Sequence, residues 1–382
     1  YKEDIFWDLV KSKNWWTDAI DSTTLLDDAS IIAFIFRDLG YSVDLLDAEN
    51  GILYKNDGSK VNILNGCFSS WIESADPDDV YSILRNYQLV IISTGVSDEN
   101  GLTLANIQGF LTCAFGSNTD TARDNMEKFF SGINEYIETG GYVLLIGGAW
   151  DDVFSSEYIK QGSSLWIFFE NYLGLDLDSA LSPQSTTDIR GGTSKLEAKK
   201  IIGSDTGHSN PFFGHYWFFD DRNTPMVPSG PEGGHYPVVD TFPVLYGTGY
   251  AKVESVSQDN WYVVVGNITR ISTPSGFIES RVMIVGTPIG AILNYPERKD
   301  FLSRIITWFF PREYDITLNM IWLNIAYSGS SYIFAFEMPV YLANMGSEGT
   351  NVIVSVSLVE RSTGMPIYQE SDIEYLPAYG TT

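Results

Sequence analysis

Basic residues are scarce in this sequence. Its 382 residues hold 23 Lys and Arg against 49 Asp and Glu, which gives a formal net charge of −26. Nucleic acids and anionic lipid surfaces repel a polyanion of this kind. The charge therefore excludes nucleic-acid binding and makes bound cations expected partners; no cofactor is certain, and calcium is one that could bind.

Long apolar runs are also missing. No stretch reaches the roughly 18 consecutive apolar residues of a membrane helix, and the runs Ile31–Phe36 and Leu165–Phe169 end within a few residues. We therefore expect no membrane span. Hydrophobic residues make up 44% of the chain and charged residues 19%, which is typical of a globular protein with a sizeable core.

Cysteine is limited to Cys67 and Cys113. In an oxidising compartment they would close a loop of about 46 residues, and otherwise they are two separate buried thiols. Aromatic residues reach 14%, with ten Trp, as in many surface or secreted proteins. The chain begins at Tyr1, which suits a mature product or an artificial boundary. We expect an extracellular or cell-surface location, where the sequon at Asn267 is a possible glycosylation site.

Helical and buried-strand patterns alternate in the first part of the chain. Helices are expected over 23–39, 76–87 and 120–138, and the apolar runs Leu89–Ser93 and Tyr142–Ile146 read as strands covered on both faces. A hairpin is expected at Asn56-Asp57-Gly58. This alternation is typical of an α/β fold with a doubly wound, mostly parallel sheet. Further elements are expected: a helix over 163–173, strands near 197–202, 249–256, 261–266 and 281–286, and a helix over 297–309.

Beyond Pro311 the pattern becomes all-β. Strands are expected over Ile316–Ile325, Tyr332–Met338, Val352–Val359 and Pro366–Tyr368. Short strands with Ser/Gly turns and no helix favour a β-sandwich-like tail, which at about 70 residues is a strand short or continues in a longer chain. The expected domains are 1–311, which is α/β, and 312–382, which is Ig-like.

Several segments resemble known families. Gly40–Val43, Tyr87–Ile92, Tyr136–Gly148 and Arg281–Gly286 with the helix after it are similar in order and spacing to the class I glutamine-amidotransferase-like fold, especially its non-amidotransferase branches. Over 341–356 the tail is similar to Ig-like adhesion modules of prokaryotic surface proteins.

The resemblance implies a catalytic cysteine on the sharp turn after the central strand. Here that turn reads Gly147-Gly148-Ala149-Trp150 and offers no nucleophile. The resemblance therefore implies the fold without the family's chemistry.

All three histidines fall in one Gly- and Pro-rich stretch, 203–245. His208, His215 and His235, with Asp220 and Asp221, include ligand types that hold a transition metal, but no spacing places two of them on one face. Loop histidines bonded to the backbone are the alternative. A loop this long is often functional, so a binding lid or a subunit contact is expected, against plain irregular packing.

Asp151 and Asp152 follow the central strand. With Gly148 they lie at the edge where α/β sheets usually bind ligands, and they could contribute to a calcium or ligand site. A solvated face or a helix cap is the alternative, and paired carboxylates for glycoside hydrolysis would look the same. Trp15-Trp16 and Trp217 could stack on a sugar or a neighbouring subunit, although core packing is the preferred interpretation.

These observations favour a non-enzymatic extracellular structural or assembly protein. It would be a self-associating subunit of a surface layer, filament or adhesin, with other surface proteins or glycans as further partners. The alternative is a secreted hydrolase or a glycan-binding module. Either would use the strand-end crevice at Gly148–Asp152 and the histidine-containing loop.

Overall fold

The structure is a computed structural model of the chain. It describes residues 3–8, 17–18, 21–25, 28–48, 50–93, 115–116, 118–147, 150–154, 158–181, 200–204, 210–212, 214–219, 239–253, 261–274, 276–293, 295–311, 316–320, 324–328, 333–337, 340–344, 349–359, 366–376 and 380–381.

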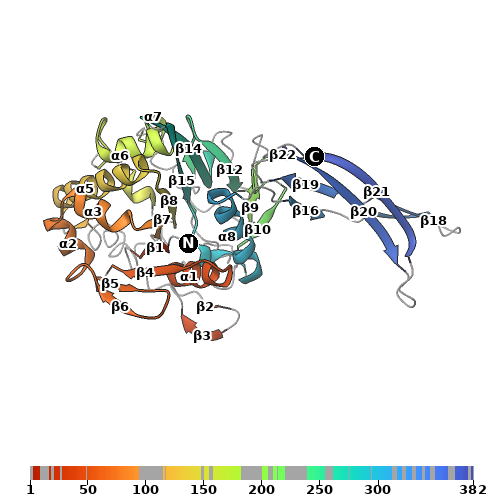
Figure 1. Cartoon of the computed structure of the whole chain (residues 1–382), viewed down its shortest axis with the longest axis horizontal. Coiled ribbons are helices and arrows are strands. Elements are labelled where there is room, and N and C mark those ends of the chain that lie inside the picture. The colour runs from red at the N-terminus through yellow and green to blue at the C-terminus, as the bar shows by residue number, and fades with distance from the viewer. Residues whose placement is uncertain are drawn as a thin grey trace, which may run out of the picture. The chain divides into compact units, whose positions relative to one another are not determined.

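The described residues form an 11-stranded sheet in the order β10-β9-β12-β14-β15-β8-β7-β1-β4-β5-β6 (Figure 1). Its strands are β1 (Glu3–Asp8), β4 (Val43–Asp47), β5 (Ile52–Tyr54), β6 (Lys60–Asn62), β7 (Tyr87–Ser93), β8 (Tyr142–Ile146), β9 (Lys200–Gly203), β10 (Tyr216–Phe218), β12 (Thr248–Val253), β14 (Val264–Thr273) and β15 (Gly276–Val285). Strands β4, β1, β7, β8 and β15 run parallel in the centre.

The expectation of a doubly wound, mostly parallel sheet is wrong. Among the described strands of this sheet, only four of the ten pairings are parallel, and the other six are antiparallel. The β14–β15 hairpin extends one side, and the β4-β5-β6 meander extends the other. A buried strand gives an apolar run in the sequence whichever way the strand is directed. The alternation of helices and strands therefore predicted only the parallel centre of the sheet.

The hairpin predicted at Asn56-Asp57-Gly58 is confirmed. Strands β5 and β6 pair antiparallel around it. Gly58 has a φ of +84° and donates its N–H to the Lys55 carbonyl at 2.9 Å. Glycine adopts this left-handed conformation without steric cost, which is why the turn closes here.

The helices are α1 (Asp28–Asp38), α2 (Phe68–Ser74), α3 (Pro77–Leu84), α5 (Thr119–Glu138), α6 (Ser164–Trp166), α7 (Leu177–Ala180) and α8 (Tyr295–Phe309), with a π-helix, η2 (Ile167–Tyr172), and two 3₁₀ helices, η1 (Trp150–Val153) and η3 (Ile289–Ala291). Asp76 and Asp79 form a capping box at α3. The predicted start of the first helix at residue 23 is wrong, because 21–25 form β3, which pairs with β2 (Thr17–Asp18). No described helix has the length and apolar character to cross a membrane.

An aromatic core lies between α2, α3, α5 and η2 and one face of the sheet. Phe68, Phe129, Phe130 and Phe168 form a chain of ring contacts with centroids 5.0–5.6 Å apart, and all four are buried. Such ring pairs add about 0.5–1.5 kcal/mol each beyond area burial. This packing holds the central strands rigidly and so fixes the positions of their ends.

The chain divides into two compact units, which are 1–204 with 215–303 and 205–214 with 304–382. In the second, the described strands form three small antiparallel sheets in place of the predicted sandwich. β16 (Ile316–Met320) and β17 (Asn324–Ser328) divide one predicted strand. The other strands are β18 (Ile333–Glu337), β19 (Val340–Asn344), β20 (Thr350–Val359), β21 (Pro366–Leu376) and β22 (Gly380–Thr381). The predicted domain boundary at Pro311 stays a prediction.

Candidate functional site at the carboxyl edge of the parallel strands

Polar residues occupy the last positions of three neighbouring parallel strands. Asp8 ends β1 and is the register partner of Asp47 in β4 and of Ser93 in β7. The row continues through Ile146 of β8 to Val285 of β15. In open α/β sheets, ligands bind in the crevice outside the carboxyl ends of the strands. We therefore take the row Asp47–Asp8–Ser93, called the acidic row below, as the centre of the candidate site.

Asp8 was not found from the sequence, because the opening segment reads equally well as helix or strand. The signal that could have found it is the apolar run Ile5–Trp7 with acidic residues on both sides. A run of this kind is too short to separate strand from helix by periodicity.

The Asp47 carboxylate is held in a fixed orientation. The residue is only 4% exposed. Its Oδ1 accepts the Asn50 backbone N–H at 3.3 Å, and its Oδ2 accepts the Asn50 Nδ2 group at 2.9 Å. Ser93 is 2% exposed at the equivalent position of β7.

A buried carboxylate organises the turn after β8. Asp240 is fully buried, and its Oδ2 accepts the N–H of Trp150, the first residue of η1, at 3.1 Å. Its own N–H donates to the Gly286 carbonyl at 2.7 Å. A Cβ at Gly286 would lie 2.1 Å from the Asp240 carbonyl oxygen, so only glycine fits there. Asp240 thus joins the turn after β8 to the end of β15.

Asp151 and Asp152 lie in η1, directly after this turn. Their backbone is therefore placed beyond the carboxyl end of β8. Their side chains, and Gly148, lie outside the described residues. Gly147 is described, and it has a φ of +135° and donates its N–H to the Val285 carbonyl at 3.0 Å.

Only one of the five predicted metal-site residues is described. His215 precedes β10, its carbonyl accepts the Gly203 N–H at 2.9 Å, and its ring stacks on Trp217 with centroids 5.9 Å apart. His208, His235, Asp220 and Asp221 lie outside the described residues. Within the described part of the chain, no group of three or more His, Cys, Asp or Glu is placed to hold a metal ion. The metal and calcium sites stay predictions.

The remaining predicted sites lie elsewhere. The Cys67 sulfur lies 3.2 Å from the hydroxyls of both Ser69 and Ser70, which hold the pKa of its thiol below the ordinary value. Cys113 lies outside the described residues, so the disulfide stays a prediction. Asn267 lies in β14, and its Nδ2 group donates to the Tyr172 carbonyl at 3.0 Å. A glycan attached to this nitrogen would replace one of its two hydrogens and leave a single N–H for this bond.

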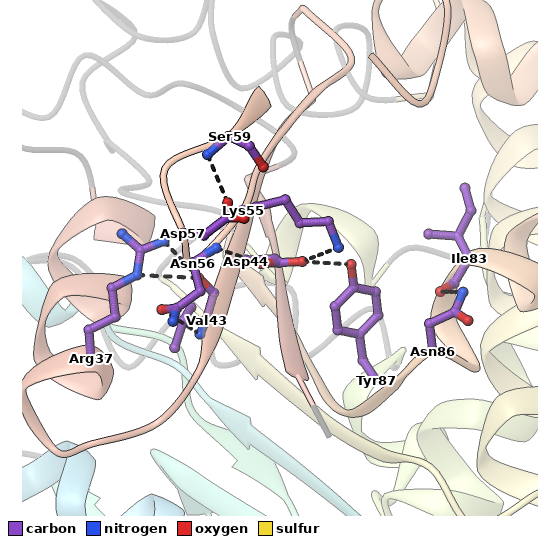
Figure 2. Close-up of polar contacts among 10 residues, drawn as sticks. All are labelled: Arg37, Val43, Asp44, Lys55, Asn56, Asp57, Ser59, Ile83, Asn86 and Tyr87. Carbon is purple, nitrogen blue, oxygen red and sulfur yellow. Dashed lines mark hydrogen bonds and ion pairs between the residues drawn. The ribbon is translucent and has the colours of Figure 1, made fainter. Parts of the chain in front are cut away.

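A second polar cluster lies at the opposite, amino end of the parallel strands. Figure 2 shows Lys55 and Tyr87 pointing toward Asp44 at the start of β4. Asp44 Oδ2 lies 2.7 Å from Lys55 Nζ and accepts the Tyr87 hydroxyl at 3.1 Å, while Oδ1 accepts the Asn56 N–H at 2.8 Å. Burial, and then the charge of Asp44, raise the pKa of the Tyr87 hydroxyl. This carboxylate is fully buried and has a counter-charge in Lys55 besides its two other donors, which indicates a structural role.

No family model matches the chain, and no curated protein matches it. Among solved structures, it is similar to the β-galactosidase from Bacillus circulans sp. alkalophilus, with 11% identity and a TM-score of 0.35. It is also similar to Gan42B, a GH42 β-galactosidase, with 11% identity and a TM-score of 0.32. A catalytic mutant of Gan42B from G. stearothermophilus gives 11% identity and a TM-score of 0.28. All of this chain is covered, but the chain spans only 39–40% of the length of these proteins.

These findings correct two expectations from the sequence. The kinship with class I glutamine-amidotransferase-like proteins is wrong, because no family model matches the chain and the large sheet is mixed instead of mostly parallel. The expectation of a surface-layer, filament or adhesin subunit is withdrawn, because nothing in the comparisons or in the described part of the structure supports it. At these TM-scores the likeness carries no argument about this chain's own fold or activity. The extracellular location stays a prediction.

Proposed function

We propose that this protein binds neutral carbohydrate at the carboxyl edge of its parallel strands. The observation that carries the proposal is the acidic row, in which Asp47, Asp8 and Ser93 share one register line. Carboxylates and hydroxyls accept hydrogen bonds from sugar hydroxyls, and Asp47 is already oriented by Asn50. Neighbouring strands lie about 4.8 Å apart, so the row spans about 10 Å, comparable with one or two sugar rings.

Charge favours this ligand class over the other compounds that bind at such edges. Phosphate-bearing cofactors need backbone N–H groups or cations to balance their charge. A chain with a net charge of −26 disfavours such anions, and the acidic row adds carboxylate positions at the edge itself. Neutral polyols carry no such penalty and supply the hydrogen-bond donors that carboxylates require.

Glycoside hydrolysis is the second candidate, and one feature favours it. Asp8 and Asp47 are register partners on adjacent strands, so their backbones lie about 4.8 Å apart. Retaining glycosidases place two carboxyl groups about 5–5.5 Å apart. In this scheme the Asp47 carboxylate attacks the anomeric carbon and Asp8 protonates the departing oxygen. Asp8 then takes a proton from the water that releases the sugar from Asp47.

Affinity electrophoresis through gels containing neutral polysaccharides (β-glucan, xylan, galactan or galactomannan) tests binding. Activity on 4-nitrophenyl glycosides tests hydrolysis. Retardation by a polysaccharide that is lost in Asp47→Asn and Asp8→Asn, without glycoside cleavage, supports binding. Cleavage abolished by either substitution supports the second candidate. A wild-type protein that no polysaccharide retards and that cleaves no glycoside contradicts both.

A further inference from the structure

Strand β10 alternates between exposed and buried aromatic residues. Tyr216 is 51% exposed and Phe218 42% exposed, whereas Trp217 between them is only 2% exposed. Successive side chains of a strand point to opposite faces of the sheet. Tyr216 and Phe218 therefore lie on one outward face, and Trp217 lies on the covered one. Of the three, the sequence had singled out Trp217 as a stacking candidate, with core packing preferred.

Trp217 makes this strand a rigid support. Its indole Nε1–H donates to Asp300 Oδ2 at 2.9 Å. Its ring meets Phe301 of α8 edge-on, with centroids 5.0 Å apart, and stacks on His215. The indole is thus fixed by a hydrogen bond and by ring contacts, which holds the neighbouring residues of β10 in place.

The outward face presents adjacent apolar side chains. The Tyr216 and Phe218 rings are 5.5 Å apart between centroids, at an interplanar angle of 81°. Ile202 of β9 is the register partner of Tyr216 and is 36% exposed. We call Ile202, Tyr216 and Phe218 the aromatic platform. Lys200, the register partner of Phe218, places its ammonium 6.0 Å from the centre of the Tyr216 ring.

The platform does not suit the addition of a strand. On the outer side of β10, the Phe218 N–H donates to Glu297 Oε2 at 3.1 Å, and the Phe218 carbonyl accepts the Leu293 N–H at 2.8 Å. Both backbone groups of Phe218 on this side are therefore occupied, so a new strand could pair only with Tyr216. An edge that is partly occupied in this way is a poor template for another chain.

The platform is also small for a protein partner. Stable protein interfaces bury about 800 Å² on each side, far more than three partly exposed side chains offer. The charge of −26 disfavours nucleic acids and anionic lipids, which could otherwise use exposed aromatic rings. The occupant that fits best is small, uncharged and partly apolar, with a face of C–H groups that stacks on a ring.

We propose that the aromatic platform is a second carbohydrate subsite, which takes a pyranose ring by stacking on Tyr216 or Phe218. The assignment rests on the proposed carbohydrate function and deepens it by adding a subsite that lies away from the acidic row. Strand β10 lies seven strand spacings from β1, roughly 34 Å along the sheet, so only an extended neutral oligosaccharide could contact both sites, and a shorter one would bind at either of them.

The test is isothermal titration of cellohexaose, xylohexaose, mannohexaose and a β-1,4-galacto-oligosaccharide into the full chain. The variants are Tyr216→Ala with Phe218→Ala, and Tyr216→Trp as the conservative change. Phe277→Ala is the matched control, because Phe277 is 74% exposed on β15 and lies outside the platform. For a hexasaccharide that binds wild type, we expect the double variant to lose at least about tenfold in affinity. Tyr216→Trp and Phe277→Ala should bind as wild type does.

The outcomes separate this inference from the proposed site. If wild type binds and the double variant binds equally well, the platform is not a subsite, whereas Asp47→Asn still tests the acidic row. If the double variant loses affinity and Asp47→Asn does not, the platform stands and the acidic row is the wrong site. If wild type binds none of the four probes, the inference fails with the proposed function. Circular dichroism and the unfolding midpoint of each variant check that it is folded.

Discussion

The ammonium of Lys55 lies 2.7 Å from the carboxylate of Asp44, whose side chain is completely buried while that of Lys55 is 32% exposed. The pair joins the β4–β5 hairpin to the amino end of the parallel strands, and the Tyr87 hydroxyl bonds to the same oxygen from β7. The polar groups of the cluster at the amino end thus bond to one another. The acidic row lies at the opposite, carboxyl end, where a ligand is expected.

Removing the partner of Asp44 should destabilise the fold strongly. Lys55→Met leaves a buried carboxylate without its counter-charge, and we expect a loss of about 3 kcal/mol in the free energy of unfolding. Urea denaturation measures it. Lys60→Met is the matched control, because Lys60 lies on the exposed edge strand β6 over the Tyr54 ring and should cost less than about 1 kcal/mol. Equal losses would contradict the structural role of the pair.

The close approach of Gly286 to Asp240 makes a second prediction. Gly286→Ala forces a methyl group against the Asp240 carbonyl, and we expect a loss of about 3 kcal/mol or more. Gly162→Ala is the control, because Gly162 also resists substitution, with a φ of +81°, yet has no atom within 4 Å of the added carbon. It should cost about 1 kcal/mol. Thermal unfolding compares the two, and a reversed order would show that the turn after β8 is not held as described.

The Glu297 carboxyl should make the stability of the fold depend on pH. Burial, and then the charge of Asp300, raise the pKa of Glu297 above its ordinary value, although the Phe218 N–H opposes the shift. The folded state therefore binds the proton more tightly, so its stability falls as the pH rises from the ordinary pKa through the raised one. Glu297→Gln should be more stable than wild type at about pH 7, and the difference should shrink toward about pH 4. A difference that stays constant between these pH values would contradict the prediction.

The Cys67 thiol should be unusually reactive for a surface cysteine. The Ser69 and Ser70 hydroxyls lower its pKa, which raises the thiolate fraction near neutral pH. In a Cys113→Ser background, Ser69→Ala with Ser70→Ala should slow alkylation by iodoacetamide, as followed by mass spectrometry. Ser74→Ala is the control, because its hydroxyl donates to the Trp71 carbonyl instead. An unchanged rate in the double variant would show that these hydroxyls do not activate the thiol.

The sequence predicted the individual elements of the core better than their arrangement. The strand Tyr142–Ile146 was predicted with its observed bounds, and the long helix was predicted within one residue of its start at Thr119. Both have strong local signals, an apolar run after two glycines and a wide apolar helix face. Strand direction has no such signal, since a buried strand looks the same in either direction. The antiparallel flanks were therefore missed, apart from the β5–β6 hairpin, which its turn residues predicted.

The candidate site was only partly accessible to sequence reasoning. Asp151 and Asp152 were singled out because they follow a recognisable strand. Asp8 was missed because its strand was not placed, and Asp47 because nothing local marks a strand-end carboxylate as a ligand group. The aromatic platform was missed for another reason. Period-two alternation over Tyr216–Phe218 does not say which face α8 covers, and that contact is fixed by residues about 80 positions later.

The most direct test of the central claim is the affinity of wild type and of Asp47→Asn for a neutral hexasaccharide, measured by isothermal titration. Asparagine keeps the shape of the side chain but removes the charge and one acceptor oxygen. We expect measurable binding by wild type and at least about a tenfold weaker Kd for the variant, which circular dichroism should show to be folded although it loses one of the two hydrogen bonds from Asn50. Equal affinity in the two proteins, or no binding by wild type to any neutral oligosaccharide, would contradict the claim.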